Sequence, residues 1–153
     1  MPRVSNIDVF HRREQPTISI RTTTAIENLP VLIGESYCRM ADYLREQGEL
    51  LSDVPYVAYH NMDMQHLDVE IGFPVSKALP ERGDVRPGSI PEGTIVSCMY
   101  RGAYRDMAST YDEMANWIEE NGLKPVDTVY EYYYNGPEYP ESELLTKIVM
   151  PVV

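Results

Sequence analysis

The chain has 153 residues, enough for one domain with a proper core or for two small fused halves. Its hydrophobic fraction of 43% is that of a globular protein, and no apolar run reaches the length of a membrane span, so we expect a cytoplasmic protein with no membrane partner. The net charge of −11 argues against direct nucleic-acid binding, which needs clustered Lys and Arg, and favours cationic ligands.

The predicted elements follow the order strand, helix, strand, strand, and this order occurs twice. β-Branched and aromatic residues bounded by turn residues predict the strands, and apolar residues at helical spacing predict the helices. In the first copy the strands are 17–23, 56–61 and 67–75, and the helix ends at Gly48. In the second copy the strands are 94–101, 129–135 and 144–152, and the helix ends at Gly122.

An internal repeat supports this division. The segment YCRMADYLREQG (37–48) aligns without gaps with YDEMANWIEENG (111–122), and at the same offset of 74 positions Asn61 meets Asn135. We therefore predict a single domain over 1–153, built from two repeats at about 15–76 and 92–153 that a Pro/Gly-rich connector, 77–91, joins. The expected class is α+β, an antiparallel sheet with two helices on one face and a central ligand groove on the other.

The stretch TVYEYYYNGP (128–137) contains the main candidate site, because it places one carboxylate among four tyrosines. A glutamate costs free energy when it is buried alone. Side chains alternate along a strand, so Glu131 and Tyr133 share one face. If Tyr130 and Tyr132 pack beneath the helix, Glu131 and Tyr133 face the groove.

The repeat extends this face into the first half of the chain. It maps Glu131 onto Val57 and Tyr133 onto Tyr59. In the strand that contains Glu70, the apolar positions should face the helix, which places Glu70 on the groove side. A carboxylate in a groove lined by tyrosines is complementary to an organic cation, through charge and cation–π attraction. The alternative is that Glu131 is a solvated strand residue and the tyrosines belong to the core.

Other motifs predict neither a cofactor nor a metal site. His60 and His66 flank a predicted turn with Asp63 between them, but no third ligand has supporting spacing, so we expect a solvated loop. The sequence has no phosphate-binding glycine loop and no nucleophile elbow. Cys38 and Cys98 lie in apolar contexts, which predicts buried, reduced thiols.

The chain resembles the GyrI-like small-molecule-binding domains, which are also the effector-binding domains of AraC-type and MerR-type multidrug transcription regulators. The resemblance runs from about Gln15 to Val153 and rests on four segments: IPEGTIVSCMYRGAY, YDEMANWIEENG, YEYYYNGP and LLTKIVMPV. It implies a groove that binds lipophilic, often cationic compounds, with the family's groove glutamate at Glu131, its neighbouring tyrosine at Tyr133 and its helix-start tyrosine at Tyr104. About fourteen residues precede the first predicted strand, so we expect a stand-alone domain without a helix-turn-helix region.

These observations predict a binding domain for small lipophilic, preferably cationic molecules, without catalytic residues or cofactors. The expected ligand contacts are Glu131, Tyr133, Tyr59, Val57, Tyr104 and Glu70. Three other functions remain open, and the simplest of them is a purely structural or subunit-assembly role. A hydrolase of reactive small-molecule toxins would use Glu131, Glu70 and Tyr133. A protein that modulates DNA gyrase, or that works with a separate regulator, would need a protein-binding surface that the sequence does not identify.

Overall fold

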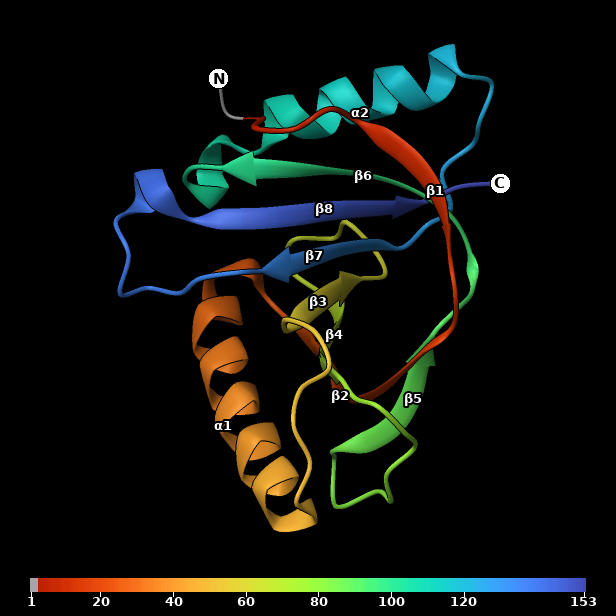
Figure 1. Ribbon diagram of the computed structural model, residues 1–153. Helices are drawn as coiled ribbons and strands as arrows, with labels where there is room; N and C mark the ends of the chain where they lie inside the picture. The colour runs from red at the N-terminus through yellow and green to blue at the C-terminus, as the bar shows by residue number, and fades with distance from the viewer. Residues whose placement is uncertain (1–2) are drawn as a thin grey trace. The chain divides into compact units, whose positions relative to one another are not determined.

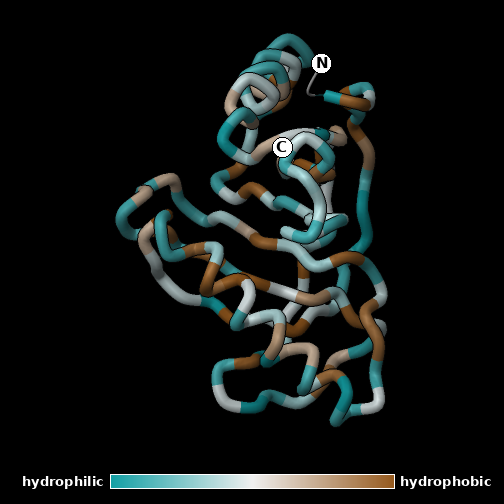
Figure 2. The backbone as a smooth tube through the Cα atoms, turned by 90° about the vertical axis from the view of Figure 1, so that its left-hand side faces the viewer, coloured by the Kyte–Doolittle hydropathy of each residue, from teal (hydrophilic) through white to brown (hydrophobic). Residues whose placement is uncertain are grey.

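The computed structural model describes residues 3–153, and the chain forms two compact units. Unit 1 takes in the chain up to Arg12 together with Gly93–Val153, and unit 2 is Arg13–Glu92. Each unit combines antiparallel strands with one long helix (Figure 1), which confirms the α+β class. Hydrophobic and hydrophilic residues are interspersed along the backbone (Figure 2), and no helix within residues 3–153 is long and apolar enough to cross a membrane.

Unit 2 follows the predicted order of strand, helix, strand, strand. Its elements are β2 (Gln15–Thr24), the 3-10 helix η1 (Ile26–Asn28), α1 (Leu29–Gln47), β3 (Tyr56–Tyr59), β4 (Leu67–Pro74) and β5 (Arg86–Ile90). The strands lie in the order β3-β4-β2-β5, and each neighbouring pair is antiparallel. The Tyr37 ring on α1 packs against the Phe73 ring on β4, with centroids 5.4 Å apart. Helix α1 ends at Gly48, whose φ of 67° is the left-handed conformation that glycine adopts at low cost.

Unit 1 repeats this order. Its elements are β1 (Asp8–Arg12), β6 (Gly93–Arg101), the 3-10 helix η2 (Tyr104–Asp106), α2 (Ala108–Glu120), β7 (Val129–Tyr133), the 3-10 helix η3 (Glu141–Glu143) and β8 (Leu145–Pro151). The strand order is β1-β6-β8-β7. Helix α2 and the sheet enclose a core cluster of Val96, Cys98, Tyr100, Met107, Met114, Ile118, Ile148, Met150 and Val152.

Two strands were not predicted. Strand β1 is almost entirely exposed along its length, so its sequence lacks the alternation that marks a half-buried strand. Strand β5 lies inside the segment predicted as a connector, and its Pro87 and Gly88 are residues typical of turns. It is an edge strand that pairs only with β2 in the order given above, a place where a proline is tolerated. Pairing with a neighbour, rather than local propensity, makes both segments strands.

The two asparagines that the repeat aligns have the same structural role. The side-chain amide of Asn61 donates to the His66 carbonyl (3.0 Å), and its oxygen accepts from the backbone N–H of Asp68 (3.0 Å). Asn135 likewise donates to the Glu143 carbonyl (2.9 Å) and accepts from the backbone N–H of Leu145 (2.8 Å). In each unit the asparagine thus closes the loop between the second and third strands of the repeat and fixes where the second strand ends.

Candidate functional site

Glu131 lies on the face of the unit 1 sheet that α2 covers. Its register partner on β8 is Ile148, which is completely buried in the core cluster and pairs in turn with Cys98 on β6. Val129, two residues before Glu131 and therefore on the same face, also packs against this cluster. The carboxylate thus stands at the border of an apolar core and is itself only partly buried.

This arrangement corrects the predicted face of β7. Tyr130 and Tyr132 were expected beneath the helix, and they lie on the opposite face of the strand. There the guanidinium of Arg12 stands 4.7 Å from the centroid of the Tyr130 ring, and the ammonium of Lys147 stands 5.5 Å from that of Tyr132. Both tyrosines are buried although they lie on the face opposite α2, so their burial did not require the helix.

Both oxygens of the Glu131 carboxylate accept phenolic hydrogen bonds. Tyr133, on the same strand face, donates to Oε1 at 2.7 Å. Tyr111, in the first turn of α2, donates to Oε2. Tyr111 was not predicted as a site residue, although Tyr111 begins the segment that the two halves share and lies four positions after the buried Met107. That spacing turns Tyr111 toward the sheet.

The surroundings of Glu131 have opposing effects on its pKa. Burial beside apolar side chains disfavours the charged form and raises the pKa of the carboxyl above its ordinary value. The hydrogen bonds from Tyr111 and Tyr133 stabilise the charged form and offset part of this rise. The net direction is upward, so the folded protein holds a proton on Glu131 more readily than an unfolded chain would.

Tyr104 completes a group that we call the Glu131 cluster: Tyr104, Tyr111, Glu131 and Tyr133. Tyr104 is the first residue of η2, and its ring meets the Tyr133 ring edge to face, with centroids 5.6 Å apart and an interplanar angle of 71°. It is 47% exposed. Burial of part of its phenol, together with the charge on Glu131, raises the pKa of Tyr104. The cluster therefore has a partly buried carboxylate and an aromatic ring that is open to solvent.

The three predicted contacts from unit 2 do not share one sheet face. Val57 and Tyr59 pair with the apolar positions of β4, which face α1, whereas Glu70 pairs with Ala58 and lies on the other face. The expectation that all three line one surface was therefore wrong. Val57 is completely buried, and Tyr59 is partly buried. As ligand contacts, these residues remain predictions.

Glu70 has its own set of partners in unit 2. The Tyr56 hydroxyl donates to Oε2 at 2.7 Å, and the His60 ring nitrogen Nε2 lies 3.2 Å from Oε1. Tyr56 reaches Glu70 by lying across Gly72, where a Cβ would stand 2.3 Å from the tyrosine ring. Gly72 is thus required by the close approach of the ring.

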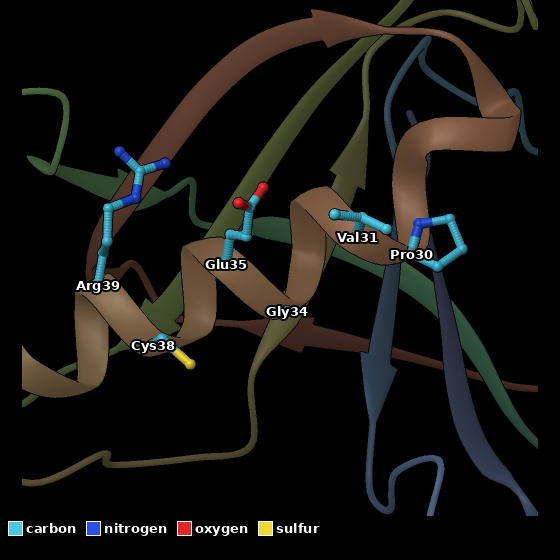
Figure 3. A pocket seen from close by; sticks show the side chains of 6 residues that line it. All are labelled: Pro30, Val31, Gly34, Glu35, Cys38 and Arg39. Atoms are coloured by element: carbon cyan, nitrogen blue, oxygen red, sulfur yellow. The ribbon is translucent and has the colours of Figure 1, made fainter.

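An open hollow runs along α1 and contains none of the predicted site residues (Figure 3). It is lined by Pro30, Val31, Gly34, Glu35, Cys38 and Arg39. Cys38 is exposed here, so its predicted burial was wrong, whereas Cys98 is buried as predicted and its thiol has a pKa raised to about 11 by burial. Within residues 3–153 no three His, Cys, Asp or Glu side chains gather in a position to hold a metal ion.

Comparisons with known proteins agree with this fold. A family model described as a GyrI-like small molecule binding domain matches residues 6–153. An EcmrR–DNA complex is similar over 97% of this chain and 57% of its own, with a TM-score of 0.82 and 20% identity. The chain therefore spans little more than half of that protein. No curated protein sequence matches the chain significantly.

Two further solved structures are similar over nearly the whole of both chains. A hydrolase from Listeria innocua has a TM-score of 0.75 and 13% identity, covering 97% of this chain and 92% of that one. SAV2435 bound to tetraphenylphosphonium has a TM-score of 0.64 and 12% identity, covering 97% and 94%. At these identities the likeness shows the fold.

Proposed function

Because the chain belongs to the GyrI-like small-molecule-binding family, we propose that it binds small lipophilic organic cations at the Glu131 cluster. Glu131 supplies the counter-charge, and the rings of Tyr104 and Tyr133 supply aromatic contact. Tyr111 keeps the carboxylate hydrogen-bonded when the site is empty. Small-molecule binding itself follows from membership of the family.

The observation that supports the cation most strongly is the environment of the Glu131 carboxylate. It stands beside the apolar core, and burial raises its pKa, so a cationic partner would stabilise its charged form. Both of its described hydrogen-bond partners are neutral phenols. A cation without N–H donors can approach such a carboxylate across the tyrosine faces, where each ring contributes about 0.5–2 kcal/mol.

The protein's other properties are consistent with this ligand class. The net charge of −11 raises the local concentration of cations around the molecule. A protein of the same fold, SAV2435, has been seen bound to tetraphenylphosphonium, which is a lipophilic cation without N–H donors. That ligand is therefore a suitable probe for this chain.

Isothermal titration calorimetry tests the proposal with tetraphenylphosphonium and with triphenylphosphine oxide, a neutral molecule of related shape. We expect the wild type to bind the cation and to bind the neutral compound much more weakly. Glu131→Gln should lose roughly ten- to a hundredfold in affinity for the cation. Glu70→Gln is the comparison variant, because Glu70 is also a partly buried carboxylate that accepts a hydrogen bond from a tyrosine hydroxyl, and its affinity tests the predicted contact at Glu70 separately from the Glu131 cluster. If Glu131→Gln binds the cation as tightly as the wild type does, the proposal is wrong.

Hydrolysis is the second candidate function, and the raised pKa of Glu131 favours it, because a carboxyl that keeps its proton can act as a general acid. The predicted second acid, Glu70, is engaged by Tyr56 and His60. Mass spectrometry of each ligand after incubation separates the two functions. Recovery of unchanged ligand supports binding alone, whereas a product that fails to form with Glu131→Gln would assign the hydrolase function.

A further inference from the structure

A second tyrosine, Tyr100, forms a hydrogen bond to the turn that precedes Tyr104. Tyr100, at the end of β6, is 1% exposed, and its hydroxyl donates to the carbonyl of Ala103 at 2.5 Å. Ala103 immediately precedes Tyr104 and is the N-terminal cap of η2. The hydroxyl of Tyr100 thus fixes the peptide that leads directly into the exposed aromatic residue of the Glu131 cluster.

Two further contacts define the same turn. The backbone N–H of Gly102 donates to the Leu144 carbonyl at 2.9 Å, and Gly102 has a φ of 146°, which an L residue rarely adopts. A Cβ on Gly102 would stand 2.9 Å from the Tyr100 hydroxyl oxygen, so the glycine also makes room for that hydroxyl. The ion pair between Arg105 and Glu141 (2.6 Å) is exposed and contributes little.

The strand register relates Tyr100 to the cluster. Tyr100 on β6, Thr146 on β8 and Tyr133 on β7 are successive register partners, so the three side chains form a row on the face that α2 covers. Tyr104 follows the turn after β6, and its ring contacts the Tyr133 ring edge to face. The distance between these two rings therefore depends on the turn at 102–103.

We propose that Tyr100 is a positioning residue of the ligand site: its hydroxyl holds the turn at Ala103 and thereby sets where the Tyr104 ring stands against Tyr133. This inference rests on the proposed cation site for its functional meaning, but the geometric claim can be tested without a ligand. Tyr100 itself is buried and acts only through Tyr104.

The first test is ligand-free. In the wild type, ring-labelled tyrosines should give a nuclear Overhauser contact between Tyr104 and Tyr133. Tyr100→Phe keeps the ring in the core and removes the hydroxyl, so we expect this contact to weaken or disappear. Tyr43→Phe is the matched control, because Tyr43 in unit 2 is also 1% exposed and donates its hydroxyl to a backbone carbonyl, that of Pro80. It should lose comparable stability and keep the Tyr104–Tyr133 contact.

The second test uses tetraphenylphosphonium affinity in a double-mutant cycle. Tyr100→Phe should weaken binding roughly three- to tenfold, and the same change should have no further effect in a Tyr104→Ala background. If Tyr100→Phe does not fold, Gly102→Ala displaces the same turn and should give the same two results. A folded Tyr100→Phe with an unchanged ring contact overturns the inference. Failure of the wild type to bind the cation would instead overturn the proposed function and leave the ring contact to decide the role of Tyr100.

Discussion

At Glu131 two opposing effects act on one carboxylate. Burial beside Ile148 raises its pKa, and the phenols of Tyr111 and Tyr133 lower it, with burial the larger effect. A fully solvated glutamate would show neither effect, and an isolated buried one would show only the first. Removing each contribution separately therefore tests the environment of Glu131 directly.

Removing one phenol hydroxyl should raise the pKa of Glu131 further. Tyr111→Phe and Tyr133→Phe each delete a hydrogen bond that favours the charged carboxylate, while the ring continues to exclude water. The measurement is an NMR titration of the side-chain carboxyl carbon of Glu131. Tyr37→Phe, at the aligned position of α1, is the control and should leave the titration unchanged. An unchanged or lowered pKa in both site variants would show that these hydroxyls do not stabilise the charged form.

The pKa of Glu131 also predicts how stability depends on pH. Because the folded-state pKa lies above the ordinary value of 4.5, the folded protein binds this proton more tightly than the unfolded chain does. The wild type should therefore lose stability as pH rises from the unfolded pKa through the folded pKa. Glu131→Gln lacks this titration. The free energy of unfolding of Glu131→Gln minus that of the wild type should therefore increase as pH rises across this window. Urea denaturation of both proteins at several pH values measures this difference, and a difference that decreases with rising pH would contradict the account.

At the scale of elements, alternation along a strand predicts which side chains share a face but does not decide which face meets the helix. On β7 the apolar-looking choice was Tyr130 and Tyr132, yet Val129 and Glu131 face α2. On the face opposite α2, Arg12 of β1 contacts the Tyr130 ring and Lys147 of β8 contacts the Tyr132 ring. Local patterning contains no information about such contacts. The sequence therefore predicted that Glu131 and Tyr133 share a face, but not that this face is the one that α2 covers.

The aligned asparagines give an element-scale prediction. Asn61→Ala and Asn135→Ala each remove two hydrogen bonds that close a loop between strands, so each should cost about 1–3 kcal/mol in the free energy of unfolding. Asn121→Ala is the control, because its exposed side chain donates one hydrogen bond, to the Trp117 carbonyl, and should cost less. Chemical denaturation compares the three variants. A loss at Asn61 or Asn135 no larger than that at Asn121 would show that the repeated asparagine is not a structural requirement.

At the scale of the whole molecule, the repeat made the fold class predictable. The alignment of 37–48 with 111–122 placed both helices, and both end before a glycine with a φ near 70°, at Gly48 and Gly122. Strands β1 and β5 were not predicted, because pairing with a neighbouring strand, and not the propensity of their own residues, makes them strands. Tyr111 escaped because a tyrosine at helical spacing is equally compatible with packing and with a hydrogen bond to a carboxylate that lies 20 residues away.

The net charge of −11 and the proposed site at the Glu131 cluster would each favour cations, but only the proposed site predicts that affinity depends on one ionisable group. A cation should bind the charged carboxylate more tightly than the protonated one, so affinity and proton release are linked. Because the net charge of −11 is almost the same in Glu131→Gln, that variant separates the site from the surface.

The most direct measurement of the central claim is therefore the affinity for tetraphenylphosphonium as a function of pH, in the wild type and in Glu131→Gln. We predict that wild-type affinity rises with pH as Glu131 loses its proton and then levels off, whereas the affinity of Glu131→Gln is weaker and does not follow this titration. Equal affinities with the same pH dependence in the two proteins would contradict a role for Glu131 as the counter-charge.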